Sequence, residues 1–257
     1  MLRGAVPAGI APFRVMGPPT MTDDTADNPP PVPDRLYGRR RGHPLRPRQQ
    51  ALLDVTLPRL LLSPADAASN PAAAFGNAPG EVWLEVGFGG GEHSHAQAQA
   101  NPGIGLIASE VFENGICSLL GKLVPEGGEA TAPLPPNLRL WTEDARRLIR
   151  SLPAGSLSRL FLMFPDPWPK ARHAKRRFVH PSILPALAAA IRPGGQWRIA
   201  TDDPTYQQWV IEVMEAQDLF RRVSLDLVRP EGWPPTRYEA KALREGRQPM
   251  YWVWERV

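Results

Sequence analysis

The sequence has 257 residues, of which 42% are hydrophobic and 22% charged, and its formal net charge at pH 7 is +4. This size and composition suit one sizeable globular domain with tails. The single cysteine, Cys117, excludes an intramolecular disulfide, and no uninterrupted apolar run approaches the ~18 residues of a membrane span. We therefore expect a cytoplasmic protein with no membrane segment. The sequence leaves the oligomeric state open, and a monomer is the default expectation.

Three consecutive parts of the chain differ in composition. Residues 1–33 are rich in Pro, Ala, Thr and Asp, so they cannot bury enough surface to offset ordering entropy, and we predict a disordered extension. Residues 34–62 combine a basic arm with a leading helix over 49–62 that Pro58 interrupts. Residues 63–257 are predicted to form the main domain, which opens with a turn-rich loop over 63–80.

From residue 81 onward, short apolar runs alternate with helical stretches, as in a parallel sheet covered on both faces. The predicted strands are residues 82–86, 105–109, 138–141, 160–164, 196–200, 222–228 and 250–256. Helices are expected to begin near Gly91, Asn114, Ala145 and Pro181, and after Pro204. A polar segment over residues 229–249, with no predicted helix, separates the last two strands. The pattern predicts a Rossmann-like, doubly wound α/β fold: a mostly parallel seven-stranded sheet with a terminal antiparallel pair. Such sheets bind ligands outside the carboxyl ends of their strands.

A glycine-rich turn, EVGFGGG, follows the first predicted strand at residues 85–91. Gly87 and Gly89 permit positive φ and let the backbone come close to a cofactor. A nicotinamide dinucleotide site uses the spacing G-x-G-x-x-G, whereas the spacing here is G-x-G-G-G, preceded by Glu85. That carboxylate would repel a pyrophosphate, but it suits the ammonium and sulfonium of S-adenosylmethionine. The turn therefore favours S-adenosylmethionine over a nicotinamide cofactor.

Two further acids follow the next two predicted strands. Glu110 ends the second strand, where a carboxylate can accept both hydrogen bonds of a ribose diol in either cofactor. Asp144 follows the third strand and is placed to accept a hydrogen bond from an adenine amino group. It can equally cap the helix that begins at Ala145, and both roles stay open.

The fourth strand runs into FPDPWPK at residues 164–170, where three prolines occur within five residues. Proline fixes φ and restricts the residue before it, so this turn is predicted to be stiff and to preset the direction of the Asp166 carboxylate. Trp168 offers a flat surface for a nucleobase or for packing. The alternative is a packed aromatic turn that carries an exposed acid.

Positive charge is concentrated in two segments that contain no carboxylate. Residues 35–48 include six arginines, and residues 170–177 include five lysines or arginines. Such clusters are typical of a polyphosphate partner, because each neutralised phosphate releases counterions, although a solvated basic surface has the same composition. The five histidines and Cys117 show no metal-ligand spacing, so we predict no metal.

The string FPDPWPK, followed by ARHAKRR at 171–177, resembles the motif of the bacterial tRNA (guanine-N7)-methyltransferases. The likeness continues in the glycine-rich turn, in ATD at 200–202 and in TRYEAK at 236–241. It spans roughly residues 35–257 in the order of the family. Residues 1–33 have no counterpart in this pattern, and the basic arm matches it only loosely.

The resemblance implies a class I methyltransferase that transfers a methyl group from S-adenosylmethionine to N7 of a guanosine in tRNA, at position 46 of the variable loop. It implies that Asp166 is the catalytic residue. The implied cofactor-binding residues are Glu85, Gly87, Gly89, Glu110, Asp144 and Asp166. The implied substrate-binding residues are Lys170, Asp202, Thr236, Arg237, Tyr238 and Glu239. The implied RNA contacts are Arg172, His173, Ala174, Lys175, Arg176 and Arg177.

Three other functions are compatible with parts of this pattern. A methyltransferase acting on an exocyclic amine also carries a proline-rich motif after strand four, but that motif usually pairs a small polar residue with two adjacent prolines. A non-catalytic RNA-binding protein can share the scaffold, since fold does not fix function, but it would not need the cofactor acids. A nicotinamide oxidoreductase is disfavoured by Glu85 and by the glycine spacing.

Overall fold

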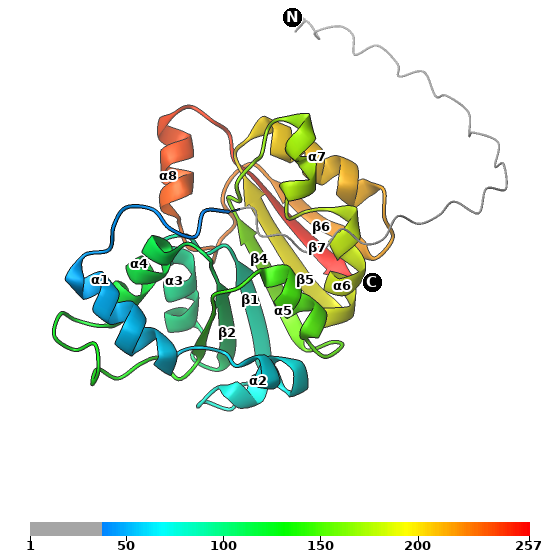
Figure 1. The fold of residues 1–257 in the computed structure, drawn as a ribbon. Helices are drawn as coiled ribbons and strands as arrows, with labels where there is room; N and C mark the ends of the chain where they lie inside the picture. Colours follow the sequence, from blue (N-terminus) through cyan, green and yellow to red (C-terminus); the bar gives the residue numbers. More distant parts are fainter. Residues whose placement is uncertain (1–37) are drawn as a thin grey trace, which may run out of the picture. The chain divides into compact units, whose positions relative to one another are not determined.

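The computed structural model describes residues 38–257, so the predicted extension over 1–33 lies outside the described residues. Seven strands form one sheet in the order β3-β2-β1-β4-β5-β7-β6 (Figure 1). The strands are β1 (Glu81–Val86), β2 (Ile104–Ser109), β3 (Leu138–Trp141), β4 (Leu157–Met163), β5 (Ile191–Thr201), β6 (Phe220–Asp226) and β7 (Met250–Arg256). Strands β1 to β5 pair in parallel, and β7 pairs antiparallel with both β5 and β6. The predicted fold class is confirmed.

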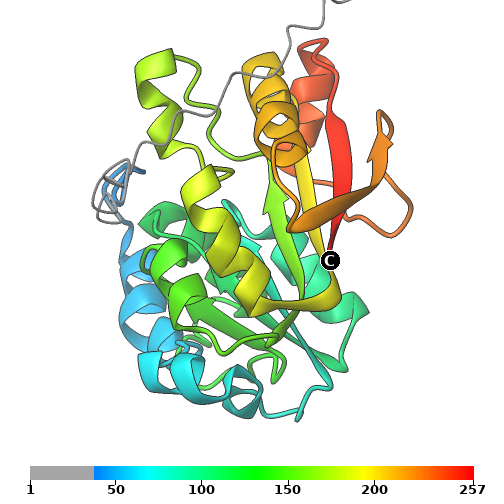
Figure 2. The same cartoon turned by 90° about the vertical axis from the view of Figure 1, so that its right-hand side faces the viewer.

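Helices cover both faces of the sheet (Figures 1 and 2). The main ones are α3 (Glu92–Ala100), α4 (Glu113–Leu123), α5 (Ala145–Ser151), α6 (Leu184–Ala190) and α7 (Pro204–Glu215). Side chains of a strand alternate between the two faces. Leu160 and Leu162 of β4 accordingly pack in the same core as α5, α6 and α7. Phe161 and Met163 pack in the core that α3 and α4 help to form.

Residues 63–80, predicted to be a loop, contain two short helical elements. Helix α2 (Pro64–Ser69) begins after Ser63, whose hydroxyl accepts a hydrogen bond from the Asp66 amide. A 3₁₀ turn (Pro71–Ala74) begins after Asn70, whose side chain accepts from the Ala72 amide. In both elements a capping side chain precedes a proline, and this combination starts helices because the missing proline N–H would have no partner there.

Two other predictions need correction. The leading helix is divided into α1 (Pro47–Ala51), a π-helical turn (Leu52–Thr56) and a 3₁₀ turn (Leu57–Arg59). It ends before residue 62, because Leu61 forms a parallel bridge with Leu140 of β3. The polar segment between the last two strands contains a helix, α8 (Arg237–Arg244), which begins at the cap that Thr236 provides to the Glu239 amide. Within residues 38–257, no helix combines the length and apolar character needed to cross a bilayer.

Candidate active site

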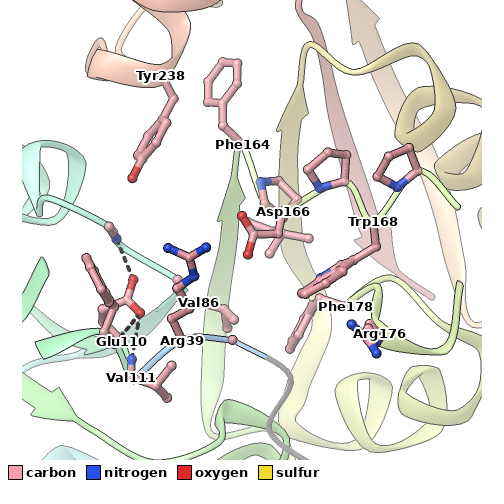
Figure 3. Close-up of a pocket in the computed structure, with 18 residues that line it drawn as sticks. Arg39, Val86, Glu110, Val111, Phe164, Asp166, Trp168, Arg176, Phe178 and Tyr238 are labelled. Atoms are coloured by element: carbon pink, nitrogen blue, oxygen red, sulfur yellow. Dashed lines mark hydrogen bonds between the residues drawn. The ribbon is translucent and has the colours of Figure 1, made fainter. Parts of the chain in front are cut away.

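A pocket of about 700 Å³ opens where β1, β2 and β4 end, which is the edge where a doubly wound sheet binds ligands (Figure 3). Its walls come from the turns that follow these strands, from the basic arm and from α8. The lining residues are Gly38, Arg39, Val86, Gly87, Gly89, Glu110, Val111, Phe112, Leu162, Phe164, Pro165, Asp166, Pro167, Trp168, Pro169, Arg176, Phe178 and Tyr238. The glycine-rich turn, Glu110 and Asp166 therefore share one cavity, as their sequence positions predict.

The glycine-rich turn depends on missing side chains at two positions. Gly89 has φ of 58°, and a Cβ there would lie 2.9 Å from the ring of Tyr238. A Cβ at Gly90 would lie 1.1 Å from the guanidinium of Arg237, which forms an ion pair with Glu92 at 3.1 Å, so a side chain there would displace that arginine. Glycine thus allows the left-handed backbone at 89 and the approach of the Arg237 side chain at 90.

Glu110 fixes the other side of the pocket through three backbone amides. Its carboxylate accepts hydrogen bonds from Gly89 at 2.8 Å, from Val111 at 2.7 Å and from Phe112 at 3.0 Å. Burial raises the pKa of this carboxyl; the amide donors oppose the shift and the negative charge of Asp166 adds to it. A carboxylate has about four lone-pair positions, so these bonds leave room for a further donor from a ligand.

The proline-rich turn after β4 is strained at both of its aromatic residues. Phe164 has φ of 51° and Trp168 has φ of 44°, a region that bulky side chains rarely adopt. Such conformations cost about 1–3 kcal/mol each and persist where the surroundings impose them. The turn places the exposed Asp166 carboxylate in the pocket, between Phe164 and Trp168 (Figure 3).

Two predicted cofactor acids do not line this pocket. Glu85 is 1% exposed, and its carboxylate accepts hydrogen bonds from the ring of His93 at 2.9 Å and the hydroxyl of Ser94 at 2.5 Å. Asp144 caps α5 through the Arg146 amide and pairs with the Arg146 guanidinium at 2.9 Å. The capping alternative for Asp144 is thus present in the structure.

The predicted substrate-binding residues are divided between the pocket and its supports. Tyr238 lines the pocket, and Thr236 caps the helix that carries it. Glu239 is buried and accepts hydrogen bonds from the Arg229 guanidinium and the Tyr251 hydroxyl. The carboxylate of Asp202 pairs with Arg247 at 2.5 Å. The exposed Lys170 precedes the 3₁₀ turn Ala171–Arg176.

The predicted RNA-contacting residues fall into outward and inward groups. Arg172 and Lys175 are exposed, as an RNA contact requires. Arg176 lines the pocket, and its guanidinium carbon lies 4.8 Å from the centroid of the Trp168 ring. Arg177 is only 5% exposed, and its guanidinium binds backbone carbonyls of the proline-rich turn. The RNA contact predicted for Arg177 would require an exposed side chain, whereas this side chain is buried.

Several lining residues were not among the predicted site residues. Phe112, Phe164 and Phe178 line the pocket as apolar walls, and nothing in their spacing separates them from core residues. Arg39 also lines it, and its only sequence signal is membership of the basic arm. The arm reaches the site because the Glu113 amide, at the start of α4, donates to the Arg40 carbonyl and Arg41 pairs with Glu113 at 3.2 Å. Residues 38–257 contain no group of three or more His, Cys, Asp or Glu side chains suited to hold a metal.

Comparison with known proteins connects this site to one family. A family model described as "Putative methyltransferase" matches residues 79–251. The tRNA (guanine-N(7)-)-methyltransferase of Granulibacter bethesdensis is 63% identical over 225 residues, which is 87% of this chain and 96% of that protein. The enzyme of the same name from Rhodospirillum rubrum is 44% identical over 230 residues, 86% of this chain and 88% of that protein.

Solved structures support the fold alone. The 16S rRNA methyltransferase KamB is similar with a TM-score of 0.51 and 19% identity, over 70% of this chain and 89% of that one. An antibiotic-related methyltransferase has a TM-score of 0.52 and 12% identity, over 76% and 95% of the two chains. The family match and the two relatives show that the chain belongs to the bacterial tRNA (guanine-N7)-methyltransferase family.

Proposed function

We propose that the pocket binds S-adenosylmethionine and that the methyl group is transferred to guanosine 46 in the variable loop of tRNA, in the cytoplasm. Methylation of tRNA guanine at N7 is the activity of the family to which the chain belongs. The observation that supports this site best is the presence of Asp166, on a strained turn, in one cavity with the glycine-rich turn and Glu110.

The cofactor would lie against the glycine-rich turn, with a ribose hydroxyl donating to Glu110. The Gly89 amide already holds one oxygen of Glu110, so the turn and the carboxylate are positioned together. Glu85 is a candidate for the ammonium end, but His93 and Ser94 hold its carboxylate, so a direct contact requires those hydrogen bonds to rearrange. Asp144 is a candidate for the adenine amino group, but Arg146 already binds its carboxylate, so this contact also requires those bonds to rearrange.

Orientation is the main demand of the reaction. When bound, S-adenosylmethionine would supply the methyl group. Guanine N7 carries a lone pair and no proton, so the transfer would need no general base. Fixing nucleophile and methyl group in line contributes on the order of 7–11 kcal/mol. The guanine ring becomes cationic, and the Asp166 carboxylate would stabilise that charge or accept hydrogen bonds from the Watson–Crick edge. The Trp168 ring offers a stacking surface for the unstacked base.

The activity is tested with labelled S-adenosylmethionine and bulk tRNA, followed by digestion to nucleosides. We expect labelled 7-methylguanosine, and absence of this nucleoside would reject the proposed function. Label in an exocyclically methylated nucleoside would indicate another specificity. Binding of tRNA without any label would indicate a non-catalytic RNA-binding protein. A substrate in which nucleotide 46 is not guanosine tests the position.

Neutralising the exposed basic residues should weaken tRNA binding and reduce its salt dependence. The slope of log K against log salt is negative. We expect the double substitution Arg172→Gln and Lys175→Gln to reduce the magnitude of this slope by about 0.7–0.9 for each phosphate that the variant no longer neutralises. Titrations of tRNA binding at several salt concentrations measure this. Arg221→Gln is the matched control, because Arg221 is exposed and pairs with Glu255 on the β6–β7 ribbon. A slope equal to that of the wild type would contradict phosphate contacts by Arg172 and Lys175.

Replacing Glu110 with glutamine should weaken cofactor binding. The neutral amide takes the place of a charged acceptor for the ribose hydroxyl, and a hydrogen bond to a charged group contributes about 1.5–3 kcal/mol, so we expect a loss of about 10- to 100-fold in affinity. Calorimetry with S-adenosylmethionine measures it. Glu126→Gln is the control, because Glu126 is an exposed carboxylate that does not line the pocket. Equal affinity in the Glu110 variant and the wild type would exclude Glu110 from the cofactor site.

A further inference from the structure

Arg177 is a buried cation beneath the proline-rich turn. Its Nε donates to the carbonyl of Pro167 at 3.2 Å, and an Nη donates to the carbonyl of Trp168 at 3.1 Å. The guanidinium carbon lies 4.7 Å from the centroid of the Trp209 ring. The indole N–H of Trp209 donates to the Val179 carbonyl, so that ring is itself held in place. The charge is therefore compensated by two carbonyl dipoles and an aromatic face.

The prolines of the turn fix their own φ but provide no hydrogen-bond donors to hold the backbone around them. Pro165, Pro167 and Pro169 have no amide hydrogen, so they cannot donate hydrogen bonds within the turn. Trp168 meanwhile adopts a left-handed conformation that costs about 1–3 kcal/mol. A planar guanidinium presents two donors in a fixed arrangement, which suits two successive carbonyls better than a lysine ammonium does. Arg177 supplies the donors that the prolines lack.

We infer that Arg177 is a positioning residue, which holds the turn so that Asp166 faces the pocket, and that it does not contact RNA. Asp166 immediately precedes Pro167, the first residue whose carbonyl Arg177 binds. If Trp168 relaxed toward negative φ, the backbone two residues after Asp166 would change direction, and the Asp166 carboxylate would no longer be held facing the pocket. The two adjacent arginines then have different functions: Arg176 lies over the Trp168 ring at the pocket, and Arg177 grips the backbone beneath it. This inference rests on the proposed function, because the consequence is expressed in methyl transfer.

The test compares Arg177→Met and Arg177→Lys with Arg172→Met, a substitution of the same type at an exposed position of the same segment. Single-turnover rates are measured at saturating tRNA and cofactor and normalised to cofactor-binding sites. We expect Arg177→Met to lose at least tenfold in rate while the salt slope of tRNA binding stays that of the wild type. We expect Arg177→Lys to recover part of the rate. Arg172→Met should instead change tRNA affinity and its salt slope.

Chemical rescue separates positioning from general stability. In Arg177→Ala, added guanidinium chloride at low concentration should raise the single-turnover rate, whereas sodium chloride at the same ionic strength should not. A lowered salt slope in Arg177→Met with an unchanged saturated rate would show an RNA contact and overturn the inference. Failure of both the lysine substitution and guanidinium to restore rate would also overturn it. If the wild type itself forms no 7-methylguanosine, the proposed function fails and the inference falls with it.

Discussion

Replacing Asp166 with asparagine should lower the single-turnover rate of methyl transfer by about 10²-fold or more, a typical loss when one preorganised electrostatic group is removed. The amide keeps the size of the side chain but cannot neutralise positive charge on the guanine ring. Cofactor affinity should change far less, because the glycine-rich turn and Glu110 form the opposite side of the pocket. Rapid-quench measurements with saturating tRNA, together with calorimetry for the cofactor, separate the two effects.

Asp218→Asn is the matched control for this substitution, since Asp218 is an exposed carboxylate just before β6 and does not line the pocket. An unchanged single-turnover rate in the Asp166 variant would reject its catalytic role. A loss confined to cofactor affinity would reassign Asp166 to cofactor binding.

A methyl group added to Gly115 of α4 should disturb the cofactor site although Gly115 is not in the glycine-rich turn. A Cβ there would lie 2.4 Å from the carbonyl oxygen of Gly89, a backbone atom that cannot swing aside as a flexible side chain can. Overpacking of this kind costs about 1–3 kcal/mol. The shift would also move the Gly89 amide away from Glu110, so we expect at least a tenfold loss of cofactor affinity, which corresponds to about 1.4 kcal/mol.

Gly121→Ala on the same helix is the control for Gly115→Ala. The nearest atom to a Cβ at Gly121 is a Leu52 methyl at 3.9 Å, an ordinary contact, so this substitution should stabilise the protein by up to about 1 kcal/mol through helix propensity. Urea unfolding and cofactor calorimetry on both variants measure the difference. If Gly115→Ala also stabilises the protein and binds the cofactor normally, the close packing of α4 on the turn is unimportant.

The sheet could be predicted from the sequence because apolar runs and turn residues recur at regular intervals. The seven predicted strands overlap the observed ones, with differences only at their ends. Helix α8 was missed although Thr236 and Glu239 have the spacing of a capping pair, because the polar composition around them concealed it. Its Glu239 side chain turns inward to Arg229 and Tyr251, an interaction that only the tertiary structure supplies.

The sequence predicts the site residues that follow the strand ends. It does not predict the direction of side chains that depends on packing against other elements. The glycine-rich turn, Glu110 and Asp166 follow strands, and parallel strands bring their ends to one edge. The alternation of a strand does not reveal that Glu85 meets His93 and Ser94 of the next helix. The inward direction of Arg177 is not evident from the sequence, because a charged residue usually faces solvent and the compensating Trp209 ring lies far along the chain, in α7.

The position of β7 between β5 and β6 has a consequence for synthesis on the ribosome. Strand β6 is translated before β7, yet β7 is its only neighbour in the described sheet, and one edge of β5 also awaits β7. Unpaired edges are sites of association with other chains. At ~5–20 residues per second, β7 follows β6 by seconds, so both edges lack their partner for at least that interval. Tyr238 is added during the same interval, so the pocket wall is completed only as this exposure ends.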